Sequence, residues 1–369
     1  MSRVVVAMSG GVDSSVVAAL LVEQGHEVIG MTMHLSDAPE TERTGTCCAP
    51  DDAHDARRVA NHLGIPHYVA NYKKAFKTAV IDRFVADYQN GLTPSPCVRC
   101  NDVLKFKLLL SRARELDAEF LATGHYARVV PGAFGPELHR AVDHAKDQSY
   151  FLFGASQDAL AQVMFPIGDM DKPAVRDVAR RFELPVAEKA ESMDICFVPD
   201  GDYARFVEQN ATPKPGRIVD ESGDVLGDHG GIHRFTIGQR RGLGLPGGTG
   251  APRFVIGVSG ATGDVTVGDA SRLLAAGLDA DRCNWIGPPP SPGTPVLARI
   301  RHRSAPDPAV VELAGDTLRL RFDSPIRAVA PGQAAVLYDA ERPSRVWGGG
   351  WIRASLPFSD APASAQAVD

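Results

Sequence analysis

Short apolar runs alternate with amphipathic stretches along the first 211 residues of the chain. Buried strands are predicted where the runs are brief and β-branched, at 4–7, 28–33, 67–72 and 119–126. Helices are predicted where apolar positions recur at helical spacing, at 16–21, 51–63, 76–88, 102–116, 174–182 and 203–208. Strands that alternate with helices predict an α/β domain over 1–211 with a doubly wound parallel sheet.

The pattern changes near Thr212, where glycines and short alternating runs replace the helical spacing. Runs at 217–219, 224–226, 254–257 and 264–267 predict a small β domain over 212–273. Runs at 295–303, 309–313, 317–322, 334–338 and 346–352 predict a six-stranded C-terminal β-barrel over 274–357. The polar stretch 36–50 is expected to be a mobile loop and the tail 358–369 to be disordered.

Composition narrows the class of protein. The 369 residues are 44% hydrophobic and 23% charged, and no segment has the apolar length of a membrane helix. No secretory leader is recognisable, so a cytoplasmic protein is expected. A net charge of −6 excludes a uniformly basic nucleic-acid surface but allows local basic patches. Six cysteines are too few for a disulfide framework, which favours catalytic or metal-binding roles.

The stretch from Met8 to Ser15, MSGGVDSS, joins the first predicted strand to the first helix. Gly10 and Gly11 allow positive φ and close backbone approach, while serine hydroxyls and the helix N-terminus can face a phosphate. The stretch lacks the lysine of G-x-x-x-x-G-K-[ST] and the third glycine of G-x-G-x-x-G. It resembles the loop of the ATP pyrophosphatase family, which cleaves ATP between its α and β phosphates and adenylates an acceptor. The alternative is an ordinary glycine turn in an α/β domain.

Ligands of open α/β sheets bind beyond the carboxyl ends of the strands. Gly10-Gly11, Met33 and Thr123-Gly124-His125 are therefore expected to gather there. Cys97 and Cys100 lie in a predicted loop, 93–101, because Pro94 and Pro96 disfavour helix and central strand. If Asn101 caps the next helix, Cys100 lies near a dipole end that favours thiolate.

Alternatives apply to the cysteines. The C-x-x-C could be half of a structural zinc site, although no second half appears at suitable spacing. Cys47, Cys48 and Cys283 could be buried, inert thiols.

Two clusters of basic residues lie in the β region. One comprises His233-Arg234 and 238–242, and the other comprises Arg299, Arg301 and Arg303, which would share one face of a strand. Such a face could follow RNA phosphates, or it could simply be a solvated strand surface.

Together these motifs resemble the bacterial tRNA-specific 2-thiouridylases, tRNA-uridine 2-sulfurtransferases that replace the C2 oxygen of the wobble uridine with sulfur. The resemblance extends almost end to end. It rests on 9–14, 96–101, 122–126, 146–152, 195–197, 236–240, 331–333 and 348–350.

The resemblance implies roles for individual residues. The ATP contacts would be Ala7, Met8, Ser9, Gly10, Gly11, Val12, Asp13, Ser14, Met33 and Gly124, with Asp13 orienting Mg²⁺ or phosphates. Cys100 would be the nucleophile and Cys196 the carrier of a persulfide loaded by a sulfur relay or cysteine desulfurase-type donor. Ser95, Pro96 and Cys97 would meet the target base, and Lys146, Asp147, Gln148, Arg301 and His302 the tRNA.

One departure from the family affects the chemistry. Many relatives have Asn-Pro-Asp where this chain has Ser95-Pro96-Cys97, so the acid is missing. The three thiols Cys97, Cys100 and Cys196 could instead hold a [4Fe-4S] cluster with an open iron position, and His125 or water could move the proton. Two other readings remain: a synthetase that adenylates a small molecule, and a non-catalytic metal or redox module on an RNA-binding protein.

Overall fold

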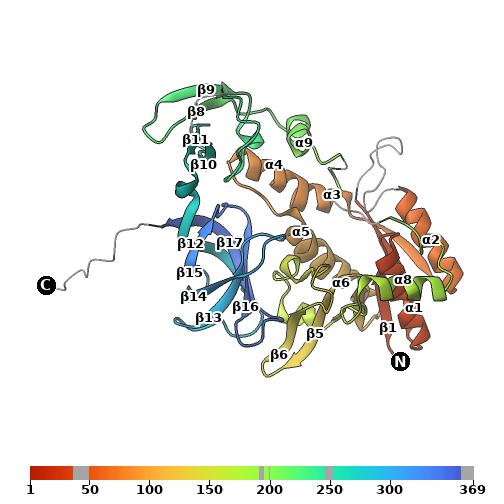
Figure 1. The fold of residues 1–369 in the computed structure, drawn as a ribbon. Coiled ribbons are helices and arrows are strands. Elements are labelled where there is room, and N and C mark those ends of the chain that lie inside the picture. The colour runs from red at the N-terminus through yellow and green to blue at the C-terminus, as the bar shows by residue number, and fades with distance from the viewer. Residues whose placement is uncertain (36–49, 191–194, 199, 246–251, 359–369) are drawn as a thin grey trace.

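The computed structural model describes residues 1–35, 50–190, 195–198, 200–245 and 252–358. Its strands form sheets of five, four and eight strands (Figure 1). The predictions for Cys47, Cys48 and most of the loop and tail lie outside the described residues. Within the described part, no helix is both long enough and apolar enough to cross a membrane.

The five-stranded sheet confirms the predicted doubly wound α/β fold. Its order is β3-β2-β1-β4-β7, and every neighbouring pair is parallel. The strands are β1 (Arg3–Ala7), β2 (Glu27–His34), β3 (His67–Asn71), β4 (Phe120–Thr123) and β7 (Val163–Met164). From β1 the chain first adds β2 and β3 on one side. It then returns and adds β4 on the other side of β1. The carboxyl ends of β1 and β4 therefore flank the switch point, where ligands of such sheets bind.

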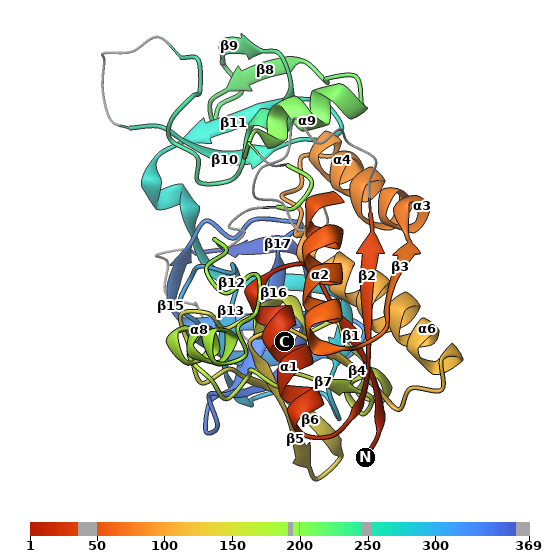
Figure 2. The ribbon, with the colours of Figure 1, turned by 90° about the vertical axis from the view of Figure 1, so that its right-hand side faces the viewer.

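Successive side chains of β1 point to opposite faces of this sheet, and helices cover both faces. Val4 and Val6 pack with residues of α1 (Val12–Glu23), α2 (Pro50–Leu63) and α8 (Lys172–Arg181). Val5 faces the opposite side and packs with Phe76, Phe84 and Leu104. All three valines are fully buried, as expected for a central parallel strand. Figure 2 shows the two groups of helices on either side of β2 and β3.

One helical run differs from the prediction at its start. The segments α5 (Pro96–Arg99), π-helix η3 (Cys100–Leu109) and α6 (Leu110–Glu115) follow one another directly. Pro96 begins the helix instead of preventing it, because the first helical position needs no backbone N–H donor. Cys100 therefore lies inside the helix, and Asn101 is not its cap. Its side-chain amide donates instead to the Phe151 carbonyl oxygen at 3.2 Å.

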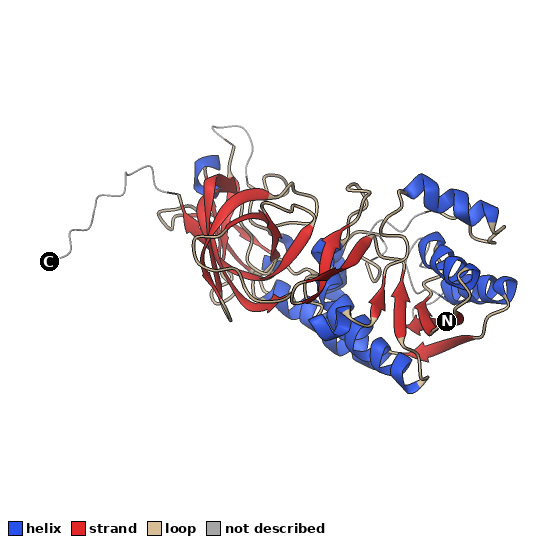
Figure 3. Cartoon of the chain, turned by 90° about the horizontal axis from the view of Figure 1, so that it is seen from below, coloured by secondary structure: helices blue, strands red, loops and turns tan. Residues whose placement is uncertain are grey.

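The eight-stranded sheet contains the predicted six-stranded barrel. The barrel strands are β12 (Leu274–Trp285), β13 (Pro295–Arg299), β14 (Asp307–Ala314), β15 (Leu318–Arg327), β16 (Ala334–Asp339) and β17 (Arg345–Pro357). Pairing of β12 with both β15 and β17 closes the barrel. The sequence did not predict β12, nor the hairpin of β5 (Ala127–Gly132) and β6 (Gly135–Arg140), which extends the sheet by pairing with β17. Figure 3 shows the barrel beside the parallel sheet.

The four-stranded sheet confirms the predicted small β domain, which lies between the α/β domain and the barrel in the sequence. Its order is β10-β11-β8-β9. The strands are β8 (Gly216–Val219), β9 (Val225–His229), β10 (Phe254–Val258) and β11 (Val265–Gly268), preceded by α9 (Tyr203–Asn210). The remaining short helices are α3 (Lys73–Phe76), η2 (Lys77–Ile81), α4 (Asp82–Gln89), η4 (Ser149–Phe151), α7 (Gln157–Leu160), η5 (Ile232–Arg234) and η6 (Ala270–Leu273).

The three glycines at 348–350 let β17 pass closely between its neighbours. A Cβ at Gly349 would lie 2.1 Å from the Ala335 carbonyl oxygen, and one at Gly348 would lie 2.2 Å from that of Asn284. Both clashing atoms belong to backbone that is fixed by the barrel. The close approach therefore requires glycine at these positions.

We expect Gly349→Ala to destabilise the barrel by about 1–3 kcal/mol, the usual cost of forcing a methyl group into a packed interior. The measurement is the urea midpoint of unfolding. Gly315→Ala is the matched control, because a Cβ there meets no atom within 4 Å. Equal midpoints for the two variants would contradict this account.

Candidate nucleotide and thiol site

A cavity of about 560 Å³ opens at the carboxyl ends of β1 and β4. The predicted phosphate loop at 8–15, called the phosphate loop below, contributes to its wall, together with the segments that carry Cys100 and Cys196 and the barrel turn at 302–303. The predicted site residues among its lining are Ala7, Met8, Ser9, Gly11, Val12, Asp13, Ser14, Met33, Cys100, Gly124, Lys146, Gln148, Cys196 and His302. Segments that are far apart in sequence thus meet at one place.

Close packing fixes the path of the phosphate loop. Gly10 has φ +73, and a Cβ there would lie 2.2 Å from the Asp52 carbonyl oxygen. A Cβ at Gly124 would lie 2.8 Å from the Ser14 backbone nitrogen. The backbone at the end of β4 can therefore approach the start of α1 only because position 124 is glycine.

Two expectations for this loop are corrected. Gly11 is the N-cap of α1 with φ −91, so only Gly10 uses the left-handed region. Ser15 is fully buried and its hydroxyl donates to the Gly11 carbonyl oxygen at 2.8 Å. The Ser14 hydroxyl accepts from the Ser9 backbone N–H at 3.1 Å, so it also supports the loop itself.

Asp13 lies in the first turn of α1 and is held by two donors. Its Oδ1 accepts from the Lys172 ammonium at 2.7 Å and from the Tyr126 hydroxyl at 2.9 Å. Oδ2 receives no hydrogen bond from the described residues. The carboxylate thus reaches the cavity with one oxygen fixed and the other available.

Lys189 binds the opposite side of the loop. Its ammonium donates to Asp52 and Asp55 at 2.7 Å each and to the Gly10 carbonyl oxygen at 3.1 Å. Burial alone would lower the pKa of Lys189, but the hydrogen bonds to the two aspartates outweigh it and the pKa is raised. Lys189 therefore stays charged and ties α2 to the phosphate loop.

His125 is buried at the end of β4 and is held from both sides. Lys105 Nζ lies 3.0 Å from Nε2, and Thr123 Oγ1 lies 2.7 Å from Nδ1. An ammonium has only donors, so Nε2 accepts and Nδ1 carries the proton that it donates to Thr123. Burial, followed by the charge of Lys105, holds the pKa of His125 well below its usual value. His125 is thus neutral, with its one acceptor already in use.

Cys100 and Cys196 both line the cavity, whereas Cys97 does not. No group of three His, Cys, Asp or Glu side chains in the described part of the chain is arranged to hold a metal ion. The predicted cluster ligands Cys97, Cys100 and Cys196 therefore do not form a ligand set in this geometry. Burial, followed by Asp281 and Asp316, raises the pKa of Cys283 to about 12, as expected for an inert thiol.

The predicted base contacts at 95–97 lie beside the cavity and not in its wall. Ser95 is the buried N-cap residue of α5, and Pro96 is buried as the first helical residue. The barrel holds the preceding loop, because the Gln333 amide donates to the Thr93 and Pro94 carbonyl oxygens at 3.0 and 3.2 Å. The barrel thereby positions the start of the helix that carries Cys100.

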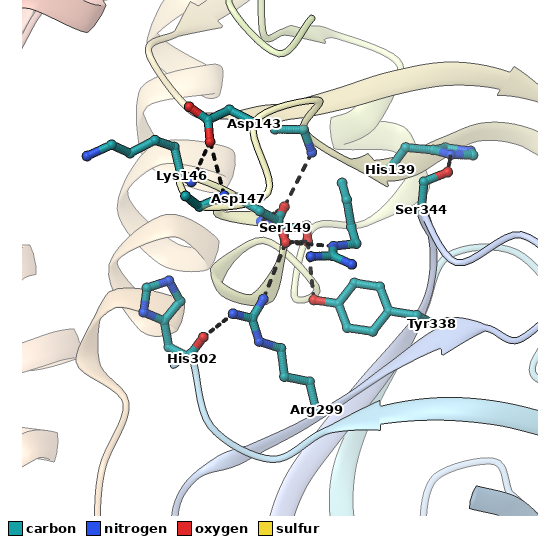
Figure 4. Close-up of polar contacts among 12 residues, drawn as sticks. His139, Asp143, Lys146, Asp147, Ser149, Arg299, His302, Tyr338 and Ser344 are labelled. Carbon is teal, nitrogen blue, oxygen red and sulfur yellow. Dashed lines mark hydrogen bonds and ion pairs between the residues drawn. The ribbon is translucent and has the colours of Figure 1, made fainter. Parts of the chain in front are cut away.

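Asp147 has a different place from the one predicted. Its side chain is fully buried, and its carboxylate accepts from Arg140 Nε at 3.0 Å and from an Arg299 guanidinium nitrogen at 3.3 Å. It also accepts from the backbone N–H and hydroxyl of Ser149 at 3.2 and 3.1 Å. Figure 4 shows this junction between the α/β unit and the barrel, with the Lys146 side chain extending away from it. Asp147 positions its neighbours and does not itself face the cavity.

The arginine strand predicted at 295–303 is corrected. β13 ends at Arg299, and Arg301 and Arg303 follow in a turn. Arg299 serves the buried junction, and the Arg301 guanidinium donates to the Ala328 carbonyl oxygen. Only Arg303, together with His302, reaches the cavity wall.

The other predicted basic cluster is internal only at His233. His233 is buried and bonds Glu208 at 2.9 Å, and Arg234 pairs with the same carboxylate. Arg240 and Arg241 are exposed. Arg234 is half exposed but already paired with Glu208, so the exposed 240–241 pair is the part of this cluster that is best placed for a ligand.

Comparisons with known proteins agree with this arrangement of three units. Family models match residues 2–200 as a tRNA methyl transferase HUP domain, 204–269 as a tRNA methyl transferase PRC-barrel domain and 275–352 as an aminomethyltransferase beta-barrel domain. The tRNA-specific 2-thiouridylase MnmA of Geobacter metallireducens is 52% identical over 96% of this chain and 97% of its own length. The chain belongs to the tRNA-specific 2-thiouridylase family. Relatives of the same name from Geotalea uraniireducens and Rhodospirillum rubrum are each 50% identical, covering 95% and 96% of this chain and 94% and 96% of their own lengths.

Sequence reasoning missed most of the lysines that line the cavity. Lys105, Lys172 and Lys189 all line it, although the phosphate loop itself has no lysine. Each comes from a separate element, so no local motif identifies them. The only local signal is weak: Lys172 stands between the helix-capping Asp171 and Pro173 at the start of α8.

The environment of His125 predicts an acid-sensitive stability. At neutral pH the imidazole is uncharged in both states, but below a pH of about 6.5 the unfolded chain takes up a proton that the native state does not. The contribution of His125 is therefore complete above about pH 6.5 and is lost as the pH falls. We expect thermal midpoints between about pH 7.5 and 5 to fall less steeply for His125→Gln than for the unmodified protein. Parallel pH profiles would contradict a neutral, buried His125.

Proposed function

We propose that this protein is an ATP-dependent tRNA-uridine 2-sulfurtransferase that converts the wobble uridine to 2-thiouridine, with AMP and pyrophosphate as products. The observation that carries the proposal is the single cavity that contains the phosphate loop, Cys100 and Cys196. An adenylating site and a sulfur-transferring site would otherwise lie apart. Names of relatives at about half identity over nearly the full chain support the same reaction.

ATP would bind with its phosphates over the loop at 9–14 and its adenine near Met33. Because Gly124 has no side chain, the end of β4 lies close beside the start of α1, whose backbone N–H groups would face the phosphates. Lys172 lies on one side of the loop, paired with Asp13, and Lys189 lies on the other, paired with two aspartates. Mg²⁺ fits this site because Asp13 Oδ2 is available, and Mg²⁺ is usually held by one or two carboxylates together with substrate phosphates. When bound, the ion would neutralise phosphate charge.

In the first step the uridine C2 oxygen attacks the α phosphorus and pyrophosphate leaves. The oxygen thereby becomes part of a good leaving group, AMP. The uridine must leave its stack to reach the cavity. Phe151 and His302 both line the cavity, and their ring centroids lie 4.3 Å apart, so the two rings pack together and present one aromatic surface on which the base would stack. Aromatic side chains commonly stack on extruded bases.

In the second step sulfur replaces the activated oxygen. The terminal sulfur of a Cys196 persulfide attacks C2 and AMP leaves, which joins Cys196 to the base through a disulfide. The Cys100 thiolate then attacks Cys196 Sγ, releasing the thiolated base and forming a Cys100–Cys196 disulfide. Alternatively, Cys100 attacks the persulfide first and the released sulfide attacks C2. Either route needs a thiol reductant for the next turnover.

The tRNA would contact Lys146, Gln148, His302 and Arg303 at the cavity rim, with Asp147 and Arg301 positioning that rim from inside. Functional boundaries are proposed at residues 211 and 273, supported by the family-model matches that end and begin close to them. The cytoplasm is the proposed location, where a persulfide-carrying sulfur donor would load Cys196. Because no three-ligand set is found among the described residues, the proposed steps use the persulfide and not a cluster.

The second candidate, a synthetase that adenylates a small molecule, shares the phosphate loop but gives no role to two cavity thiols. One assay separates the two functions. Unmodified tRNA is incubated with Mg-ATP and a persulfide donor, and its nucleosides are analysed by mass spectrometry. We expect ATP-dependent exchange of sulfur for oxygen at the wobble uridine. Pyrophosphate release that does not require tRNA, with no sulfur incorporated, would favour the synthetase.

Cysteine variants separate the persulfide route from a cluster. We expect Cys196→Ser and Cys100→Ser to lose 2-thiouridine formation but to retain tRNA-dependent pyrophosphate release. Cys97→Ser should keep both activities, because Cys97 is outside the cavity wall. Cys283→Ser is the control for general loss of a thiol. Loss of thiolation in Cys97→Ser alongside normal stability would contradict the persulfide route and favour a three-thiol cluster.

A further inference from the structure

A second cavity, of about 200 Å³, lies between the helix that carries Cys100 and the barrel. Val98, Arg99 and Phe106 of the helix line it, whereas Cys100 and Lys105 line the larger cavity. The two cavities therefore lie on different faces of one helix. The barrel contributes Arg282 and Trp351, and Figure 1 shows α5 next to β17. Nothing in the proposed reaction uses this second cavity.

The charges around this cavity do not balance. Three cations, Arg99, Lys107 and Arg282, line it together with a single carboxylate, Asp102. The carboxylates nearby already have partners. Asp102 binds Lys107 at 2.9 Å, Asp281 binds Arg282 at 3.0 Å, and Asp87 binds Arg83 at 3.0 Å.

Arg99 is the cation left over. Across the described residues, no carboxylate or carbonyl oxygen accepts a hydrogen bond from its guanidinium, which instead lies 5.3 Å over the ring of Trp351. Burial, together with Arg83 and Arg282, lowers the pKa of Arg99. The half-buried Arg99 guanidinium therefore keeps hydrogen-bond donors for a further acceptor.

Arg282 is brought to the same place by an unusual backbone. It has φ +48, in a bulge of β12 where pairing with β17 shifts between Asp281 and Asn284. This left-handed conformation is unfavourable for a residue with a Cβ, and such outliers concentrate at ligand sites. The bulge directs its guanidinium to 5.5 Å from the Trp351 ring, so both arginines contact one indole.

We propose that this cavity binds a single phosphate group between Arg99 and Arg282, with Trp351 as its apolar wall. Planar guanidinium groups match the oxygens of a phosphate with paired hydrogen bonds. The volume is below the roughly 300–1,000 Å³ of sites for larger ligands, so a whole nucleotide does not fit. The phosphate belongs either to the tRNA backbone or to a free phosphate ion. Its binding would join the helix of Cys100 to the barrel.

The test measures inorganic phosphate binding by calorimetry with the larger cavity saturated by α,β-methylene-ATP. The variants are Arg99→Met, Arg282→Met and the pair together. Arg181→Met is the matched control, since it removes an exposed arginine paired with Glu23 on the surface. Unchanged affinity for the ATP analogue reports that each variant is folded. We expect phosphate binding to weaken by about tenfold or more in each site variant and not in the control.

The salt dependence of tRNA binding identifies the source of the phosphate. If the site holds a backbone phosphate, the slope of log affinity against log salt should become shallower by about one in the site variants. Weakened phosphate binding with an unchanged slope assigns the site to free phosphate. Equal phosphate binding in the unmodified and double-variant proteins, or none in either, together with an unchanged tRNA slope, would overturn the proposal.

Discussion

The buried carboxylate of Asp147 is the interaction on which the arrangement of the molecule depends. It is enclosed by Arg140 from the hairpin and Arg299 from the barrel, whose side chains are only 17% and 11% exposed. Removing one partner from such a group costs about 3–5 kcal/mol, because a charge is left buried without a counterion. The barrel therefore has one preferred position against the α/β unit. In this position the barrel brings His302 to the cavity that Lys146 and Gln148 also line, and it completes the cavity wall.

The site is consequently a property of the whole chain. The phosphate loop supplies a helix N-terminus and a carboxylate, but lysines that line the cavity come from three other elements. Each lysine is held in place by a side chain: Lys172 by Asp13, Lys189 by two aspartates and Lys105 by His125. The same contacts order the loop before any nucleotide arrives.

Periodicity predicted the parallel sheet and the barrel because burial is periodic along each strand, as Val4, Val5 and Val6 illustrate. It failed where distant contacts decide. Pro96 would break a helix at most positions. It is tolerated here because the helix begins at this residue, which the local sequence does not reveal. β12 contains Ala, Gly and Asp, which are poor strand formers, but two neighbouring strands recruit it. Asp147 was predicted to contact tRNA, but it is buried between arginines that no local pattern connects to it.

The pairing of β6 with β17 has a consequence for biosynthesis. His139 and Ser344, which meet across this seam, are 205 residues apart. When the β5–β6 hairpin leaves the ribosome, β17 has not yet been translated, so the edge of β6 is unpaired. At that stage Arg140 and Asp147 also lack their third partner, Arg299. Unpaired edges of this kind invite pairing with other chains. The hairpin is thus made early but gains its strand partner late, and a nascent chain that stalls before β17 would present this unpaired edge to chaperones.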